Sequence, residues 1–516
     1  MKPQFPSNIG WLGTLAVAAL CLLSRLPQLT SPYLHADPNG DECVLGLMAS
    51  HMAGAQEFPF YFWGQHYGFS WIEAGAVALA IKFFGTSIFS LKVPMLLLWT
   101  LGCVFFYWAL ALWTTRTHGF WITCLLIFSP GWMVWSMRAR GGYITAFLLT
   151  TIILFLMARS RPILNKGASL GTGILLGFIF FSQPIFLLGV LPVLGYVICK
   201  QKNFKDVFIC IAGFIGVFML GKVMAHLQGN TDYWRPSGFR YDSFPTFLST
   251  FKDRVFYSLI QDPVFGKNRA PVIITNTWCA VFLVGLGFYI WRLITRKVIP
   301  RSTPFLTSVV LLLGYTFFTN CEDQYRYLAS LGIFLILWFG IQSFEWMNSG
   351  IFFRVLRGMV IGFFIIFGIF AAWNYKDFYR TLPASSKEVP EMRKLSELIG
   401  YLKASGIKYV FSVDDDLSWK LMFFSQEEII SRWGKATGRQ PAYIKAVNQA
   451  FLGGEKVAVV GNIRVEPVAY LVIETEGKPD LVADQYFVYL SPSIELIVKK
   501  LGFQLYQLPT VKGKNV

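Results

Sequence analysis

The chain has 516 residues, of which 54% are hydrophobic and 17% aromatic, with a mean hydropathy of +0.50 and a formal charge of +17. This composition is too apolar for an ordinary soluble domain. Lys and Arg are scattered between hydrophobic segments rather than gathered on one face or arm, which excludes nucleic acid as the partner of the basic charge. The sequence therefore predicts a polytopic membrane protein.

Apolar segments recur along the first 373 residues, and a bilayer core about 30 Å thick needs roughly 20 helical residues per crossing. We place Lys2 in the cytoplasm and expect the basic connections to stay there, by the positive-inside bias. The predicted fold is an α-helical polytopic membrane bundle of about 11 transmembrane helices (residues 1–373), with a C-terminal α/β soluble domain outside (residues 374–516). The expected spans lie near 10–29, 92–113, 119–137, 142–158, 168–183, 184–199, 207–223, 272–291, 304–320, 327–346 and 358–373.

The first segment follows Lys2 but lacks a small-x-small cleavage site, and Arg25 stands near its outer end. It is therefore expected to remain as a membrane anchor rather than to be removed as a signal peptide. Six of the eight cysteines lie in or beside apolar spans, as small buried side chains do. Cys43 and Cys321 are expected outside, where they could form a disulfide.

The first outer loop (residues 30–91) contains a stretch, Ser31–Trp71, with no Lys or Arg. Within it, Asp41 and Glu42 open a predicted amphipathic helix of small and apolar residues. One interpretation is that Asp41 only caps this helix and favours its dipole. The other is that Asp41 serves as a general base toward a hydroxyl or amine acceptor, with Glu42 as an orienting or acceptor-binding neighbour and Asp37 as the competing carboxylate.

Three of the five histidines (His35, His51 and His66) share this loop with the carboxylates. Their spacing matches no metal-ligand pattern such as HExxH, so we predict no metal ligands and no certain cofactor. A divalent cation held by carboxylates and a donor phosphate stays possible. The next segment, residues 70–84, contains Glu73 and Lys82 and is expected to lie along the membrane interface. If it crossed the membrane, the later basic clusters would no longer all lie on the cytoplasmic side.

Two later outer loops contain arginines against the positive-inside trend. In SMRARGGY (residues 136–143), Arg138 and Arg140 suit bidentate binding of a lipid phosphate or pyrophosphate. They could equally contact lipid headgroups or the acidic first loop. In NCEDQYRYLASL (residues 320–331), Arg326 stands between two tyrosines at the edge of a span. Together the three loops present carboxylates and arginines to one compartment, as transfer from a charged leaving group requires.

The C-terminal domain contains two predicted buried strands, KYVFSV and KVAVVG, and a helix, LSELIGYLKASG, that ends at Gly406. Residues 414–416 (Asp-Asp-Asp) are compatible with a metal-binding DxD motif, but their place directly after a strand favours a solvated turn. We expect this domain to cover the active cleft or to bind the acceptor.

In this order the segments resemble the GT-C glycosyltransferases, particularly bacterial relatives of the dolichyl-phosphate-mannose protein mannosyltransferases and of the aminoarabinose transferase that modifies lipid A. Asp41-Glu42 resembles the first-loop DE motif, and FPFYFWGQHYGFSWIEAGAVALAIKFFGTSIFSLKVPMLL resembles the aromatic-Gly-Gln-x-Tyr-Gly segment with its interfacial helix. Residues 138–143 resemble the second outer loop of this family, and QYRYLASL resembles its Arg-Tyr-Leu motif. Residues 398–431 resemble the outer α/β domain found in many members. There are two departures: Lys92 stands in the usual Leu-Arg-Leu-Pro, and Gly141-Gly142 stand where many members have Asp.

The resemblance implies an integral membrane glycosyltransferase (a hexosyl- or pentosyltransferase). It would move a sugar from a polyprenyl-phosphate donor to a glycan, lipid or protein acceptor on the extracytoplasmic face, with inversion. Asp41 would be the base, and no nucleotide-binding motif is needed. The predicted catalytic residues are Asp41 and Glu42, and the predicted substrate-binding residues are Arg138, Arg140, Arg326, Gln65, Tyr67, Glu73 and Asp37.

Two other classes stay open: a transporter or flippase of lipid-linked sugars, and a non-catalytic assembly partner. Transporters tend to show internal repeats and charges within spans, neither of which is clear in this chain. The expected partners besides donor and acceptor are membrane lipids. The closer match to prokaryotic members, and the absence of a retention signal at the C-terminus, favour a bacterial inner membrane.

Overall fold

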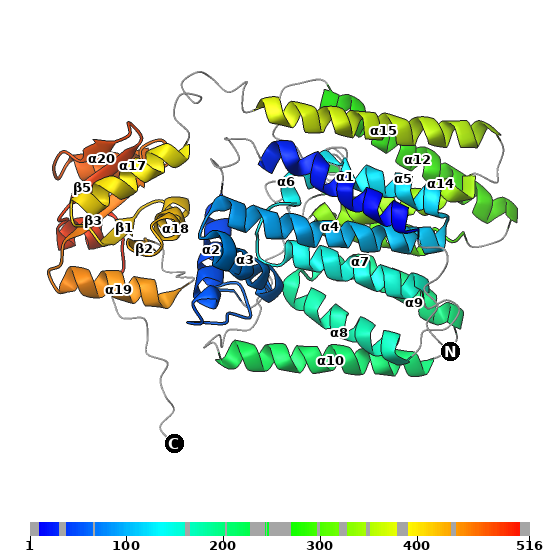
Figure 1. The fold of residues 1–516 in the computed structure, drawn as a ribbon, viewed down its shortest axis with the longest axis horizontal. Helices are drawn as coiled ribbons and strands as arrows, with labels where there is room; N and C mark the ends of the chain where they lie inside the picture. Colours follow the sequence, from blue (N-terminus) through cyan, green and yellow to red (C-terminus); the bar gives the residue numbers. More distant parts are fainter. Residues whose placement is uncertain are drawn as a thin grey trace.

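The computed structural model describes residues 10–29, 38–65, 68–159, 166–201, 204–227, 243, 245–246, 270–296, 300–318, 328–346, 351–378, 391–434 and 440–505. Figure 1 shows a helical bundle and a smaller α/β domain, with α2 (Gly40–Ala53) and α3 (Trp71–Phe84) at the end of the bundle that faces the domain. The other bundle helices are α1 (Trp11–Leu29), α4 (Ile88–Trp113), α5 (Arg116–Ile127), α6 (Pro130–Trp135), α7 (Tyr143–Arg159), α8 (Lys166–Ser182), α9 (Ile185–Gln201), α10 (Phe204–Leu227), α12 (Ala270–Arg296), α13 (Thr303–Phe318), α14 (Ala329–Trp346) and α15 (Ile351–Phe378).

The predicted span at 119–137 is wrong as a single helix. The structure ends α5 at Ile127 and starts the short α6 at Pro130. Pro130 disfavours helical geometry at the residue before it, and Ser129 adopts an extended backbone with ψ of 120°. The apolar run therefore breaks into two pieces close to the domain-facing end of the bundle.

Four described helical segments are long and apolar enough to cross a membrane: Ile88–Trp113, Lys205–Leu227, Asn276–Thr295 and Ala329–Trp346. Shorter apolar helices lie at Trp11–Pro27, Tyr143–Arg159, Lys166–Ser182, Ile185–Lys200 and Thr303–Thr316. Helix length and composition therefore support an integral membrane protein, whereas they do not establish the predicted number of about 11 spans.

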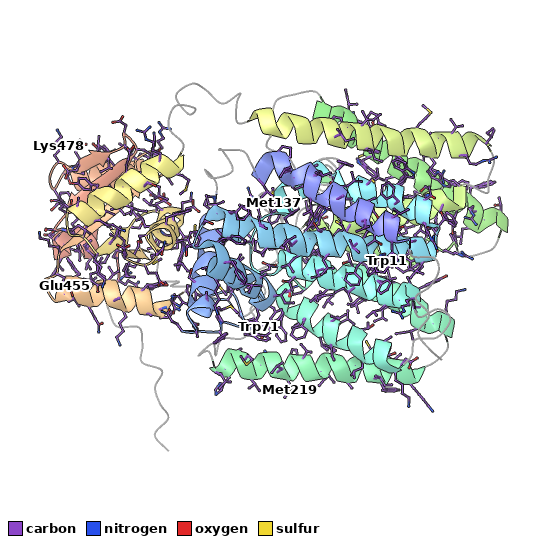
Figure 2. All side chains as sticks on the ribbon, in the orientation of Figure 1. Trp11, Trp71, Met137, Met219, Glu455 and Lys478 are labelled. Carbon is purple, nitrogen blue, oxygen red and sulfur yellow. The ribbon has the colours of Figure 1, made fainter. Side chains whose placement is uncertain are left out.

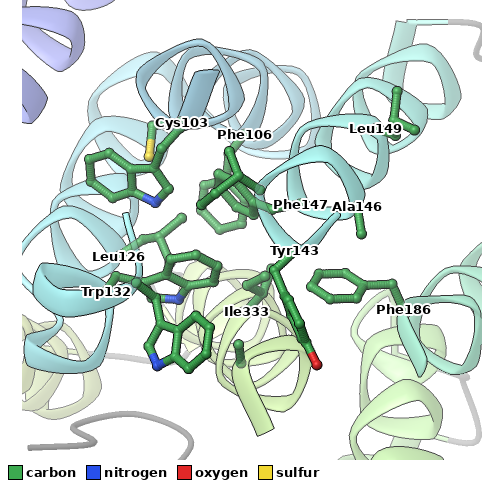
Figure 3. Packing of buried hydrophobic residues seen from close by; sticks show 14 of the residues in the cluster. Cys103, Phe106, Leu126, Trp132, Tyr143, Ala146, Phe147, Leu149, Phe186 and Ile333 are labelled. Atoms are coloured by element: carbon green, nitrogen blue, oxygen red, sulfur yellow. The ribbon is translucent and has the colours of Figure 1, made fainter. Parts of the chain in front are cut away.

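The centre of the bundle is packed by large aromatic side chains (Figure 3). Phe106 of α4, Phe147 of α7 and Phe186 of α9 are fully buried there, and the Trp132 and Phe147 rings lie 4.9 Å apart. A β-carbon at Gly102 would lie 2.5 Å from the Phe147 ring, so the glycine allows α4 and α7 to approach closely. Close packing of this kind holds helices together where lipid supplies no hydrophobic driving force.

The C-terminal domain is an α/β sandwich around one five-stranded sheet of order β2-β1-β3-β5-β4. The predicted strands and the helix ending before Gly406 are confirmed as β1, β3 and α17. Strand β1 pairs in parallel with β2 and β3, whereas β5 runs antiparallel to β3 and β4. The elements are α17 (Glu391–Ala404), β1 (Tyr409–Ser412), α18 (Asp415–Phe424), β2 (Ile430–Trp433), α19 (Pro441–Leu452), β3 (Val457–Asn462), α20 (Pro467–Glu474), β4 (Asp480–Val482), β5 (Tyr486–Leu490) and the π-helix η3 (Leu496–Lys500).

Candidate active site

The predicted helix after Asn39 exists as α2, but Asp41 does not cap it. Asn39 is the N-cap: its side chain accepts a hydrogen bond from the Glu42 amide at 3.0 Å, and the Glu42 carboxylate accepts one from the Asn39 amide at 3.4 Å. This reciprocal capping box satisfies two amides of the first turn. The interpretation of Asp41 as the cap is therefore wrong, although Asp41 lies in the first turn, where a carboxylate favours the helix dipole.

Helix α2 is not amphipathic as predicted, because residues 42–49 are all buried and so occupy every face of the helix. The C-terminal domain covers the side that a surface helix would leave in solvent (Figure 1). Cys43 is one of the buried residues and is a free thiol. Its suggested partner, Cys321, lies outside the described residues.

Glu42 is fully buried, which disagrees with a role in binding the acceptor. Its Oε1 lies 2.5 Å from Nζ of Lys92 and accepts a hydrogen bond from the Ala139 amide at 3.2 Å. Lys92 is the residue that replaces Arg in the family pattern, and its side chain is only 4% exposed. Glu42 therefore acts as a buried anchor that joins α2, α4 and the loop after α6.

Asp41, one residue earlier, turns to a different face and stays accessible. Its Oδ2 lies 3.5 Å from Nε of Arg140, and the two side chains are 19% and 22% exposed. Both Arg138 and Arg140 approach the Trp135 ring, with guanidinium carbons 5.9 and 5.8 Å from its centroid. The structure thus pairs Arg140 with Asp41, which is the contact with the acidic first loop that the sequence offered as an alternative to phosphate binding, and it places Arg138 near the same aromatic ring as Arg140.

Glu73 holds the far end of the same loop. It is fully buried, and its two oxygens accept hydrogen bonds from the Gly142 amide at 3.1 Å and the Thr145 amide at 2.9 Å. Both oxygens are thus used by the start of α7. The prediction that Glu73 contacts substrate is not supported, because the side chain serves the backbone of this loop instead.

The two glycines of the loop have a conformational reason. Gly141 and Gly142 adopt φ of +54° and +92°, a region that side chains with a β-carbon rarely adopt. A β-carbon at Gly142 would also lie 3.1 Å from the Phe69 carbonyl oxygen. The turn therefore favours glycine at position 142, where the backbone angle and the crowding both oppose a side chain.

Replacing Gly142 with Ala is expected to destabilise the protein by about 1–3 kcal/mol, because the turn would hold a non-glycine residue at strained backbone angles. Thermal unfolding in detergent measures the change. Gly400→Ala is the matched control: Gly400 lies in the exposed part of α17 with open space beside it, so this change is expected to be neutral or stabilising. Equal stability of the two variants would contradict the strain at Gly142.

Arg25 supports the other side of the loop, a role that the sequence did not reveal. It is fully buried in α1, and its Nε donates to Ser136 Oγ at 3.2 Å while Nη1 donates to the Ile127 carbonyl at 2.5 Å. Its guanidinium also lies 4.2 Å from the Trp99 ring centroid. Arg25 thus ties the end of α5 to the end of α6, directly before Arg138. The available signal was an arginine inside a predicted span, which marks a functional or structural site by default.

Gln65 lies in a turn of the first loop that reaches the same glycines. A β-carbon at Gly68, in that turn, would lie 3.2 Å from the Gly141 carbonyl oxygen and 3.3 Å from the Gln65 side chain. Gln65 is thus close to the loop that contains the two arginines. Four other predicted or considered residues, Asp37, His35, His66 and Tyr67, lie outside the described residues, as does Arg326.

His51, at the end of α2, binds carboxylates rather than completing a metal site. Its Nε2 lies 3.0 Å from Glu427 of the C-terminal domain, and its Nδ1 lies 3.7 Å from Glu57. Tyr443 donates a hydrogen bond to Glu427 at 2.5 Å. Among the described residues, no three His, Cys, Asp or Glu side chains are grouped to hold a metal ion.

Hydrogen bonds to Glu427 and Glu57 raise the pKa of His51 from 6.5 to about 9. Burial opposes the charged form of Glu427, but the bonds from His51 and Tyr443 outweigh it and lower its pKa from 4.5. A raised His pKa stabilises the fold fully below about pH 6.5, and this stabilisation is lost as pH rises toward 9. The lowered Glu pKa stabilises above about pH 4.5, and that contribution is lost on acidification.

We therefore expect the contact between α2 and the C-terminal domain to be most stable between about pH 4.5 and 6.5. Melting temperatures of the wild type should fall between pH 6.5 and 9, and His51→Gln should flatten that fall. Parallel pH curves for the two proteins would contradict the assignment.

Asp414 forms neither a metal motif nor a solvated turn. It is the N-cap of α18, and its Oδ1 accepts hydrogen bonds from the Asp416 amide at 3.0 Å and the Leu417 amide at 3.3 Å. Burial raises the pKa of Asp414, against the lowering effect of the Leu417 amide. The turn thus starts a helix that packs on α2, which the position of the motif after a strand could not show.

No family model matches the chain, and a search of curated protein sequences finds no match. Solved structures do resemble it. ArnT from Cupriavidus metallidurans bound to undecaprenyl phosphate superposes with a TM-score of 0.57 at 12% identity, over 94% of this chain and 98% of that chain.

Two further enzymes superpose over most of the chain. The oligosaccharyltransferase of Archaeoglobus fulgidus tethered with an acceptor peptide gives a TM-score of 0.52 at 11% identity, over 90% of this chain and 71% of that one. The mycobacterial arabinofuranosyltransferase AftD gives 0.53 at 13% identity, over 88% of this chain and 37% of that one. At such identities the superpositions establish a shared fold.

Proposed function

We propose that this chain, which has the fold of the GT-C glycosyltransferases, is an integral membrane enzyme that transfers a hexosyl or pentosyl group from a polyprenyl-phosphate donor to an acceptor. The observation that carries the proposal is the accessible Asp41 carboxylate beside Arg140, with Arg138 on the same aromatic ring. A base next to one cation, with a second cation in the same loop, is what transfer from an anionic leaving group needs.

In the proposed reaction, Asp41 takes the proton from an acceptor hydroxyl or amine as that atom attacks the anomeric carbon. The bond from the anomeric carbon to the phosphate oxygen breaks, and its electron pair leaves with the lipid phosphate. Attack from the side opposite the leaving group inverts the configuration. Arg138 and Arg140 stabilise the charge that grows on the phosphate, and Arg326 is proposed as a third cation.

Glu42, Glu73 and Arg25 position this site without touching substrate. They fix, respectively, the Ala139 amide, the Gly142 amide and the Ser136 hydroxyl. Buried anchors of this kind hold the reacting groups in place and reduce the reorganisation needed in the transition state. The proposed setting is a bacterial inner membrane, with the N-terminus in the cytoplasm and the site on the extracytoplasmic face.

The test supplies purified protein in liposomes with a radiolabelled polyprenyl-phosphate sugar and a mixture of glycan, lipid and peptide acceptors. Label appearing in an acceptor, with release of polyprenyl phosphate, supports the proposal. Label that crosses the bilayer without transfer would identify a flippase instead. A parallel reaction with a chelator tests whether a divalent cation takes part.

A further inference from the structure

The first turn of α2 is bonded to the C-terminal domain next to Asp41. The amide of Gly40 donates a hydrogen bond to Oδ1 of Asp416, which lies in the first turn of α18. Amides in the first turn of a helix have no partner inside the helix. Asn39 satisfies the Glu42 amide and Asp416 satisfies the Gly40 amide, so the cap of α2 is shared between two parts of the chain.

Asp416 is itself fixed from its own helix. Its Oδ2 lies 2.5 Å from Nζ of Lys420, one turn further along α18. The backbone approaches closely at this point, because a β-carbon at Gly40 would lie 3.0 Å from Asp416 Oδ1 and 3.2 Å from the Trp419 ring. The glycine at position 40 therefore allows the start of α2 to approach α18 closely.

The middle and the end of α2 are held by the same domain. A β-carbon at Gly46 would overlap the Phe423 ring, and Phe423 belongs to the same buried apolar cluster as α2. At the end of the helix, His51 binds Glu427. Three separate contacts, spaced along the whole of α2, thus come from α18 and the residues just after it. Figure 1 shows α18 beside α2.

We propose that the C-terminal domain is a positioning element for Asp41, with Asp416 as the positioning residue. Glu42 fixes α2 to the bundle, and Asp416 fixes the residue on the other side of Asp41 to the domain. Asp41 is therefore flanked by two anchors that set where its carboxylate lies. This assigns the domain a role beyond covering a cleft or binding an acceptor, and it rests on the proposed function only in taking Asp41 as the base.

The kinetic test compares Asp416→Ala with Asp416→Asn. The Ala variant removes the acceptor of the Gly40 amide, whereas Asn keeps an oxygen that can accept it. We expect the Ala variant to lose about 10-fold in kcat, since small misplacements of a reacting group are costly, with the donor KM within about 2-fold. We expect Asn to restore most of the rate.

Glu455→Ala is the matched control. Glu455 is an exposed carboxylate on the side of the domain that faces away from the bundle (Figure 2). The inference would be overturned if Asp416→Ala kept the wild-type kcat, or if Asp416→Asn were as slow as Asp416→Ala. An equal loss in Glu455→Ala would also overturn it, because the effect would then be general to the domain.

Hydrogen exchange provides a measurement that does not depend on transfer. In Asp416→Ala the amides of residues 40–42 should exchange about 10-fold faster than in the wild type, while Asp416→Asn and Glu455→Ala should match the wild type. Unchanged exchange would overturn the shared cap. Wild-type protein that transfers no sugar would overturn the proposed function, and the exchange rates would still decide whether Asp416 holds the start of α2.

Discussion

Replacing Asp41 with Asn is expected to lower the kcat of sugar transfer by about 10²–10⁴-fold, the usual contribution of a general base. Asn has nearly the same shape but cannot take a proton from the acceptor. The ion pair that it weakens, to Arg140, is partly exposed at 3.5 Å. Pairs of this kind contribute about 0–1 kcal/mol, so the melting temperature should change little.

Asp484→Asn is the matched control for this experiment, because Asp484 is an exposed carboxylate of the C-terminal domain. It should keep wild-type kcat. Asp37→Asn decides between the two carboxylates that the sequence left open, and we expect it to retain most of the rate. An Asp41→Asn protein within about 3-fold of wild type would remove Asp41 from the mechanism and leave Asp37 as the candidate.

Most of the helices could be predicted from sequence because hydropathy and length are local properties. Residues 142–158, for example, are the described helix α7 to within a residue. Pro130 is a sequence signal for the break after Ser129, but the apolar residues on both sides of it favoured the prediction of one continuous helix. A proline alone does not predict such a break, since Pro94 and Pro192 lie inside α4 and α9.

The different surroundings of the adjacent carboxylates Asp41 and Glu42 could not be predicted from the sequence. Successive residues of a helix point about 100° apart, so Asp41 and Glu42 had to face different surroundings. Which of them is buried depends on Lys92 and Ala139, which lie 50 and 97 residues further along the chain. The same holds for Asp416, which accepts a hydrogen bond from the Gly40 amide, 376 residues earlier in the chain. Pairings over such distances follow from tertiary packing, which spacing within a motif does not encode.

The buried pair of Glu42 and Lys92 leads to the second large expected effect. Removing one member leaves the other as an uncompensated charge in the interior, which usually costs about 3–5 kcal/mol. Glu42→Gln keeps an oxygen for the Ala139 amide but removes the charge, and Lys92→Met removes the ammonium from nearly the same volume. Both variants should unfold in detergent at clearly lower temperature than the wild type.

The double variant Glu42→Gln with Lys92→Met separates the ion pair from other effects of the two changes. With no charge left in the interior, it should be more stable than the sum of the single losses predicts, by about 0.5–3 kcal/mol of coupling. Because Glu42 follows Asp41 directly, the unpaired charge in each single variant should also shift Asp41 relative to Arg140 and lower kcat. In the double variant no charge is left unpaired and Gln still accepts the hydrogen bond from the Ala139 amide, so kcat should recover together with stability. Additive losses of stability would show that the two side chains do not act as a pair, and a double variant that stays slow although its stability recovers would show that the Ala139 bond does not hold Asp41 in place.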